Sequence, residues 1–384
     1  MKMIPAQKIV FINQATGYLT IDIVNAFAGK FDEVVLITGS IRVQDTYLKP
    51  GIKIVQIARY NRGSNLKKAF SWIVASFQIF FLLRIRYNRY DKFFFTVPPT
   101  AYLMVPWLKG KNSIVVFDLY PEALNASELI KDGLLSRLWA RRNRKVFLSA
   151  FKIYTLSNVM KSGIERYAGG RDVIVIPNWS AFSHLQPIEK ANNKILHREG
   201  LEGKFIVQYS GNIGKTHNIE ALIAVAEYLR DDSDIIFQII GRGAKSSKIA
   251  HQINEKGLVN CMVLPFREDG ELYESLCAAD LAVIILDDRT PDISIPSKIY
   301  NIMAAGLPVM AIARSDSGIA DLVVSHQLGK VFNKNDVAAM GHFIHELRNN
   351  TQQLGYFSSN SLKSCGLYTR ENAGLYLSTY MDEN

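Results

Sequence analysis

The chain has 384 residues, of which 48% are apolar and 21% are charged. This length exceeds one ordinary α/β core and suits two, and the balance is typical of a folded protein rather than a disordered one. The three cysteines, Cys261, Cys277 and Cys365, lie far apart without a CxxC pair. That spacing excludes a zinc or disulfide framework and suits a reducing compartment. The first residues carry no apolar signal-peptide segment, so we expect none.

The positive charge is concentrated in the first half of the chain. Residues 1–180 hold 26 Lys and Arg against 11 Asp and Glu, a net charge of +15, whereas residues 181–384 hold 19 against 24, a net charge of −5. This asymmetry predicts that the first half meets an anionic surface, either lipid or nucleic acid. Nucleic acid is the less favoured partner, because no interleaved aromatic platform or binding motif is present.

Short apolar segments alternate with helical patterns along the whole chain. Such alternation predicts α/β domains with parallel, doubly wound sheets. A stretch without periodicity, residues 177–193, is interpreted as the linker between two domains, 1–180 and 181–366. The predicted strands are 8–13, 33–38, 52–57, 92–96, 113–117, 152–155 and 172–176, followed by 205–209, 235–240, 261–264, 281–286, 308–312 and 330–332.

Two segments of the first half combine apolar and basic residues. Residues 69–85 predict a strongly apolar helix, flanked by basic residues over 67–89, that is too short and too interrupted by polar residues to span a bilayer. Residues 137–152 carry six Lys and Arg among apolar side chains. We expect 67–89 and 137–152 to lie on an anionic membrane surface. A buried core helix with a solvated basic face is the alternative.

The segment 209–219, YSGNIGKTHNI, follows a predicted strand and precedes a predicted helix. Gly211 and Gly214 allow a tight turn and a close approach of a phosphate to the backbone amides, and Lys215 can place a positive charge on a diphosphate. A P-loop is rejected, because Tyr209 stands where that motif needs its first glycine.

Other loops follow strands of the same half. Gly241-Arg242-Gly243 follows 235–240, and Pro265-Phe266-Arg267 follows 261–264, where an aromatic ring can flank a base. Asp287-Asp288 follows 281–286. Because ligands bind at the carboxyl ends of strands in open α/β sheets, we expect these loops to converge on one site.

Residues 295–310 predict a helix with Pro296 in its first turn and Gly306 at its end. The amides near Ser297 and Lys298 form a predicted anion site, which the lysine strengthens. A capped helix that packs through Ala304-Ala305 is the alternative.

At these residues the sequence resembles the retaining GT-B glycosyltransferases of family 4, including the subgroup that assembles capsule, O-antigen and exopolysaccharide. The resemblance covers nearly the whole chain. It rests on the ordered set TVPPTAYL, VFDLYPEAL, TLSNVMKSGI, VIPNW, YSGNIGKTHNI, IIGRG, LPF, YESLCAADLAVI and PSKIYNIMAAGLPVMA. It implies two Rossmann-like domains facing across a cleft, with the acceptor on the first and the sugar nucleotide on the second. It also implies that the C-terminal helix, residues 367–384, packs back on the first domain.

The resemblance assigns roles to single residues. Gly17 would face the donor phosphate and sugar. Asn212 and Lys215 would contact the diphosphate beside Gly211. Gly241, Arg242 and Phe266 would lie near the base, and Ser297 and Lys298 would cap the phosphate-binding helix.

The chain departs from the family pattern at two places. Asp118 stands after the strand 113–117 where many members carry a histidine, and it is a candidate to orient the acceptor or the sugar, although a carboxylate there can be only a helix cap. Asn301 stands where the second of two glutamates usually holds the donor ribose, and the first falls near Ile293–Ser294. Asn301 can still hydrogen-bond a hydroxyl, without a charge.

The implied activity is transfer of a sugar, with retention, from a UDP- or GDP-sugar to a lipid-linked (polyprenyl diphosphate) saccharide, on the cytoplasmic face of the plasma membrane. Neither a metal nor a cofactor is expected, because no DxD motif appears and Lys215 and Lys298 can stabilise the leaving diphosphate. A catalytically silent subunit and a sugar-nucleotide epimerase are the alternatives. A dinucleotide oxidoreductase is disfavoured, since only Gly17 follows the first strand where GxGxxG is needed.

Overall fold

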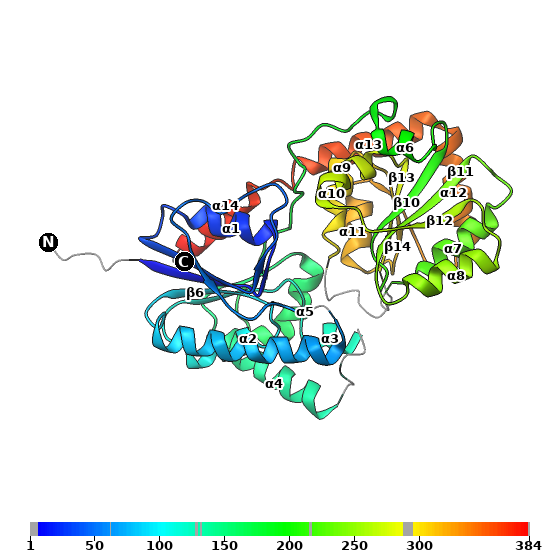
Figure 1. The fold of residues 1–384 in the computed structure, drawn as a ribbon. Coiled ribbons are helices and arrows are strands. Elements are labelled where there is room, and N and C mark those ends of the chain that lie inside the picture. The colour runs from blue at the N-terminus through cyan, green and yellow to red at the C-terminus, as the bar shows by residue number, and fades with distance from the viewer. Residues whose placement is uncertain are drawn as a thin grey trace. The chain divides into compact units, whose positions relative to one another are not determined.

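The computed structural model describes residues 7–61, 63–126, 130, 133–214, 217–286 and 295–382. The chain divides into two compact units (Figure 1). The first comprises Met1–Ala181 with Arg370–Asn384, and the second comprises Phe182–Pro291 with Ile295–Thr369. The change of unit after Ala181 is one residue from the boundary expected from sequence, and the C-terminal return begins at Arg370 rather than 367.

The first unit is built on a seven-stranded parallel sheet in the order β5-β3-β1-β6-β7-β8-β9. The five inner strands are almost entirely buried on both faces, as a sheet covered by helices on both sides requires, whereas the edge strand β5 is mostly exposed and the edge strand β9 is half-buried. A short parallel pair, β2 and β4, was not predicted from sequence. The strands are β1 Lys8–Ile12, β2 Ala15–Thr16, β3 Glu33–Thr38, β4 Ser40–Ile41, β5 Lys53–Gln56, β6 Asp91–Phe95, β7 Asn112–Val115, β8 Ile153–Thr155 and β9 Ile174–Val175.

Helices cover both faces of this sheet (Figure 1). Val10 and Ile12 of β1 pack with Ala75 and Ile79 of α2 on one face. Phe11 points to the other face and packs on Phe27 of α1 and on Phe93. The helices are α1 Tyr18–Phe27, α2 Asn65–Ile85, α3 Glu122–Ala126, α4 Leu134–Ser149, α5 Asn158–Ala168 and α14 Asn372–Met381, with the 3-10 helix η1 Ala101–Trp107.

Helix α14 brings the end of the chain onto α1. The ring of Tyr380 packs against Phe27 and Phe93, and its hydroxyl donates to Asp91 Oδ2 at 2.6 Å. Tyr380 is 3% exposed, so the C-terminal helix completes the aromatic core on this face rather than lying on the surface.

The second unit is built on a six-stranded parallel sheet in the order β12-β11-β10-β13-β14-β15. Helices α7, α8 and α12 pack against one face through an aliphatic cluster. The strands are β10 Phe205–Asn212, β11 Ile235–Arg242, β12 Cys261–Leu264, β13 Leu281–Ile285, β14 Val309–Ile312 and β15 Gly329–Phe332. The helices are η2 Lys190–Asn192, α6 Lys194–Arg198, α7 Ile219–Tyr228, α8 Ser246–Glu255, α9 Asp269–Cys277, α10 Lys298–Ala304, α11 Gly318–Ser325, α12 Val337–Asn349 and α13 Thr351–Cys365.

The stretch interpreted as a linker is buried at its two ends, whereas residues 183–192 between them are half-buried or exposed. Trp179 is fully buried in the first unit, where its indole N–H donates to Asp22 Oδ2 at 2.9 Å. Phe182 packs on Tyr273 in the second unit, with ring centres 5.1 Å apart. Asn193 is also buried and caps α6 through its side-chain oxygen. The short 3-10 helix η2 lies within this stretch, and the lack of periodicity predicted neither η2 nor the buried anchors, because one helical turn and single side chains have no period.

Helix α2 is longer than predicted, and this corrects the expectation that it is too short to span. It runs over 21 residues and by length and composition alone could cross a bilayer, with 22% of its most apolar 18-residue window buried. Its buried face repeats every four residues at Ser71, Ala75, Ile79 and Leu83. The remaining apolar side chains of this helix therefore face outward or lie at its flanks.

Candidate functional site

The second unit has its topological switch point at β10. The chain moves from β10 outward to β11 and β12, then returns to the other side of β10 with β13. Helices on the two sides of such a point leave a crevice at the carboxyl ends of the strands, where ligands bind in this class of sheet. Two glycine-containing segments lie at this edge: residues 211–214 at the end of β10, which form the glycine turn, and residues 241–243 at the end of β11.

The two segments are in register. Gly211 pairs with Gly241, and Asn212 pairs with Arg242, as the last pairs of the β10–β11 ladder. A Cβ at Gly241 would lie 1.8 Å from the carbonyl oxygen of Gly211, so only glycine allows the strands to approach this closely. A Cβ at Gly243 would lie 2.3 Å from the carbonyl oxygen of Ile213. The predicted glycines thus keep both strand ends together and open to a ligand.

Lys298, the first residue of α10, points at the glycine turn. Its Nζ lies 3.9 Å from the centre of the Tyr209 ring, and a Cβ at Gly211 would lie 3.3 Å from the same nitrogen. The Tyr209 hydroxyl donates to the Asn212 carbonyl at 2.7 Å, which holds the ring beneath the turn. The structure therefore brings together Lys298 and Gly211, two predicted residues that are 87 positions apart.

The Lys298 ammonium is buried against the ring of Tyr209. Among the residues that the structure describes, its Nζ has no hydrogen-bond partner. Burial lowers the pKa of Lys298 to about 7 from its ordinary value of 10.5. A buried cation with no hydrogen-bond partner among the described residues is costly, and an anion bound beside it would favour its charged form. A lysine whose pKa is perturbed by burial in this way is a candidate for a functional site.

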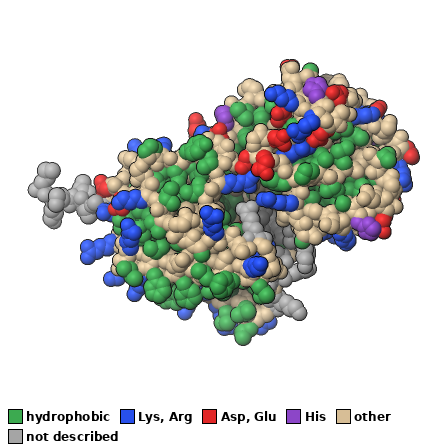
Figure 2. Space-filling view, in the orientation of Figure 1, with side chains coloured by type: hydrophobic (Ala, Val, Ile, Leu, Met, Phe, Trp, Pro, Cys, Tyr) green, Lys and Arg blue, Asp and Glu red, His purple; other side chains and the backbone are tan. Residues whose placement is uncertain are grey.

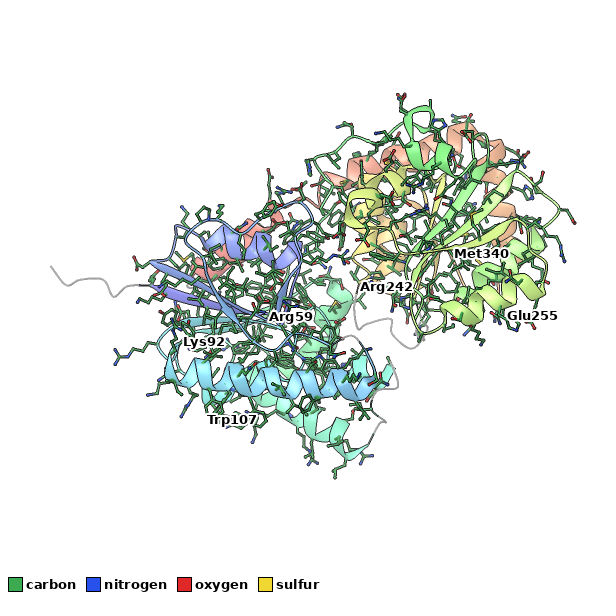
Figure 3. The ribbon with its side chains drawn as sticks, viewed as in Figure 1. Arg59, Lys92, Trp107, Arg242, Glu255 and Met340 are labelled. Carbon is green, nitrogen blue, oxygen red and sulfur yellow. The ribbon has the colours of Figure 1, made fainter. Side chains whose placement is uncertain are left out.

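Arg242 and Phe266 lie together beside this turn, as predicted. The Arg242 guanidinium stands over the Phe266 ring with its Cζ 4.8 Å from the ring centre, and Arg242 is exposed at the end of β11 (Figure 3). A ring carrying a guanidinium on one face supplies a flat surface for stacking. A planar base is the natural ligand for such a surface.

The start of α10 differs from the prediction. The helix begins at Lys298 and has seven residues, and Ser297 has helical backbone angles and makes no side-chain cap. Pro296 therefore lies one residue before the cap rather than in the first helical turn. Ser297 is exposed, and Asn301 is half-buried one turn further along α10. The lysine side chain, more than the helix end, carries the positive charge of this site.

Several predicted positions fall outside the described residues. Lys215 belongs to them, as do Asp287-Asp288 and Ile293–Ser294. The part that these residues take in the site remains a prediction.

Gly17 and Asp118 belong to the first unit and lie after β1 and β7. Gly17 caps α1 in an extended conformation, and a Cβ there would meet nothing within 4 Å. Asp118 follows β7, where its amide donates to Thr96 Oγ1 at 3.3 Å. Burial raises the pKa of Asp118 to about 6, and a hydrogen bond from Tyr120 opposes the rise. Asp118 is therefore a half-buried carboxyl at the carboxyl edge of the sheet, and its role stays a prediction.

Tyr209 was not predicted to take part in the site. Sequence reasoning used it only as the end of a strand and as the residue that excludes a P-loop. An aromatic ring directly before the Ser-Gly turn was the available signal, because a ring there can face whatever approaches the turn from α10.

Comparison with known proteins agrees with this geometry. Residues 192–364 match the family model described as glycosyl transferases group 1. A glycosyltransferase of Pseudomonas aeruginosa, WbjE, is 24% identical over 296 residues, which are 75% of this chain and 74% of that protein. WcaI of Escherichia coli (strain K12), named as a colanic acid biosynthesis glycosyl transferase, is 29% identical over 179 residues, 46% of this chain and 44% of that protein.

Solved structures show the same fold. HepE of Anabaena, in complex with UDP and glucose, has a TM-score of 0.71 at 15% identity and covers 98% of this chain and 100% of its own. WaaG, a glycosyltransferase involved in lipopolysaccharide biosynthesis, has a TM-score of 0.67 at 14% identity with the same coverage. The second unit of this chain is therefore similar to a glycosyl transferases group 1 domain over residues 192–364, and the chain has the fold of GT-B glycosyltransferases.

Proposed function

We propose that this protein transfers a sugar, with retention, from a UDP- or GDP-sugar to a lipid-linked saccharide during synthesis of a cell-surface polysaccharide. The group 1 glycosyl transferase domain supports the transfer. The names of similar proteins, in colanic acid and lipopolysaccharide biosynthesis, support the polysaccharide. The UDP bound by HepE supports a nucleotide donor.

The observation that carries the proposal is the buried Lys298 ammonium beside Gly211. A nucleotide diphosphate would place its phosphates against this lysine and the open turn, and its base against the ring of Phe266 under Arg242. Asn301, one turn along α10, would hydrogen-bond a ribose hydroxyl. Ser297 and Lys215 would border the same phosphates.

The chemistry follows from this charge placement. The bond between the sugar carbon and the diphosphate oxygen breaks, and negative charge develops on the phosphate, where Lys298 stabilises it without a metal. The acceptor hydroxyl oxygen bonds to the same face of the sugar carbon, and its proton passes to the leaving phosphate oxygen. Asp118, after β7 of the first unit, would orient the acceptor hydroxyl, and Gly17 would leave room for the donor.

A membrane surface is the proposed site of action. Apolar side chains gather over α2 and α4 in Figure 2. Along α2 they form an exposed stripe, Leu66, Phe70, Ile73, Phe77, Phe81 and Ile85, each at least 50% exposed and opposite the buried face. Basic residues of 67–89 and 137–152 flank it. Such a stripe between cations suits the headgroup boundary of an anionic bilayer, here the cytoplasmic face of the plasma membrane.

The 3-10 helix η1 joins these two helices into one surface. Arg84 of α2 donates to the Trp107 carbonyl at 3.0 Å, and the Arg142 guanidinium of α4 stands 3.7 Å from the centre of the Trp107 ring. Trp107 is 59% exposed. An exposed tryptophan held between two arginines is typical of a side chain at a lipid–water boundary.

A two-step experiment tests the function. Nucleotide diphosphates and their sugars are first screened for thermal stabilisation, since a ligand at a hundred times its Kd adds about 2.7 kcal/mol. The stabilising donor is then incubated with purified protein and polyprenyl-diphosphate-linked acceptors, and the product is analysed for its anomeric configuration. Transfer with retention is expected. Donor binding without transfer or hydrolysis would identify a silent subunit, and C2 or C4 inversion of the donor would identify an epimerase.

A further inference from the structure

A pocket of about 570 Å³ lies in the first unit at the N-terminal end of α2. The segment after β5 forms one wall through Ala58, Arg59 and Asn61, and α2 forms the other through Leu66, Lys67 and Phe70. Figure 3 places Arg59 above this end of α2. No role has been given to this pocket by the donor chemistry, which belongs to the second unit.

The walls of the pocket are fixed by hydrogen bonds rather than by chance loop packing. The Gln14 side-chain amide donates to the carbonyls of Ala58 and Ser71, both at 3.0 Å. The Ala58 amide donates to Gln78 Oε1 at 2.7 Å, and the Asn61 amide donates to Ser71 Oγ at 3.2 Å. Gln14 lies two residues after β1 and immediately before β2, so the same bonds tie the pocket to the segment that leads through β2 to Gly17.

Charge and apolar surface are adjacent in this pocket. Arg59 and Lys67 are exposed, and within the described part of the chain no carboxylate pairs with either side chain. Leu66 is 85% exposed and Phe70 is 70% exposed, and both begin the apolar stripe of α2. Two cations with no described carboxylate partner thus lie next to exposed apolar side chains. Such a surface is complementary to an amphiphile whose anionic group is joined directly to a hydrocarbon chain.

The pocket also lies near the candidate acceptor carboxyl. The Tyr60 ring stacks on Trp72 of α2, with centres 6.0 Å apart and planes 11° apart. Burial is the main cause that raises the pKa of Tyr120, with smaller contributions from Asp118 and Tyr60, and Tyr120 hydrogen-bonds Asp118. A lipid phosphate in the pocket would therefore hold the first sugars of a saccharide on the Asp118 side of the sheet edge.

We infer that this pocket binds the phosphate end of an isoprenoid lipid phosphate, with Arg59 and Lys67 on the phosphate groups and Leu66 and Phe70 on the first carbons of the chain. This inference rests on the proposed function, because it identifies the lipid phosphate as the part of the acceptor that the first unit recognises. The rest of the hydrocarbon would continue along the stripe of α2 into the bilayer.

The test uses farnesyl diphosphate as probe, by titration calorimetry in buffer without vesicles. All variants carry Lys298→Ala in addition, so that diphosphate binding at the donor site does not contribute. Relative to that parent, Arg59→Ala/Lys67→Ala should weaken binding at least tenfold. Arg137→Ala/Arg144→Ala, which removes the same charge from α4, should change it less than twofold. Leu66→Gln/Phe70→Gln should weaken the binding of farnesyl diphosphate but not the binding of inorganic pyrophosphate.

Two outcomes would overturn the inference. One is affinity within twofold of the parent in Arg59→Ala/Lys67→Ala, provided that its melting temperature shows a folded protein. The other is equal affinity of the parent for pyrophosphate and farnesyl diphosphate, which would leave a free-phosphate site without a lipid component. Nucleotide binding is tested separately, by comparing the native protein with Lys298→Ala. A failure of farnesyl diphosphate binding would therefore leave the proposed transfer reaction standing.

Discussion

The Lys298 ammonium lies 3.9 Å from the centre of the Tyr209 ring, so the first residue of α10 faces the end of β10. The aromatic face offers the cation a weak attraction, about 0.5–2 kcal/mol, which does not replace lost hydration. The lysine therefore lies at the glycine turn with its charged form destabilised by burial, and a bound anion would stabilise that form. This relationship joins the two segments on which the sequence prediction of a phosphate site depends.

The affinity for a UDP-sugar should fall as pH rises above 7. The pKa of Lys298 in the free protein is about 7, so the side chain is charged below that pH and loses its proton above it, while the diphosphate diester of a UDP-sugar does not titrate there. Titration calorimetry from pH 6 to 9 should show binding that weakens by up to about a hundredfold at the upper end, since only about 1% of the free lysine is charged two pH units above its pKa. Lys298→Arg keeps its charge and should bind with little pH dependence; a wild-type affinity that is flat over this range would disprove the charge linkage.

Phe266→Ala should lower the affinity for UDP by about fivefold and leave the affinity for inorganic pyrophosphate unchanged. The ring and the Arg242 guanidinium stack at 4.8 Å and contact no predicted phosphate position, so their loss removes base contacts worth about 1 kcal/mol. Competition binding against a labelled nucleotide measures both ligands in one assay. If pyrophosphate weakens as much as UDP, Phe266 supports the turn rather than the base.

Asp118→Asn should stabilise the protein at pH 8 while lowering turnover. The pKa of Asp118 is raised to about 6 in the folded state, so its carboxylate is destabilising above that pH, and the penalty disappears as the group becomes protonated at low pH. Two pKa units correspond to about 3 kcal/mol at most, and we expect about 1–3 kcal/mol. Urea unfolding at pH 8 and pH 4 measures the difference. A less stable variant at pH 8 would show that the carboxylate is a structural partner instead.

Phe77→Gln/Phe81→Gln should reduce binding to anionic vesicles without lowering the melting temperature. These rings are 62% and 57% exposed on α2, so they contribute little to the core, but burying each in a bilayer is worth about 1.5–3 kcal/mol. Co-sedimentation at low and high salt measures the effect. Wild-type protein should bind anionic vesicles at low salt and leave them at high salt; unchanged binding by the variant, or no wild-type binding at low salt, contradicts the membrane surface.

Sequence patterns predicted the sheets well, because period and β-branching report local backbone preference. The predicted strands 33–38 and 261–264 have the bounds of β3 and β12. Strand β10 runs three residues beyond its prediction, to Asn212, since Ser210 and Gly211 have low strand propensity and are held by pairing with β11. The pair β2–β4 is invisible to periodicity at two residues each.

The site was predictable only in part. The glycines, Arg242 and Phe266 follow strands of one parallel sheet, so their convergence follows from topology. The burial of Lys298 against Tyr209 depends on how α10 packs, which no local pattern encodes. The same holds for α2. Because its sequence is apolar on all sides, the sequence does not distinguish the buried face, with its four-residue spacing, from the exposed apolar stripe opposite it.

The most direct test of the account is the Kd of UDP for Lys298→Ala, measured at pH 6.5 beside Lys330→Ala. Lys330 is a surface lysine paired with Glu346, so its removal costs the same formal charge far from the glycine turn. The account predicts that UDP binds at least tenfold more weakly to Lys298→Ala, while Lys330→Ala keeps the wild-type Kd. Equal Kd values in the wild type and both variants would contradict the assignment of Lys298 to the diphosphate.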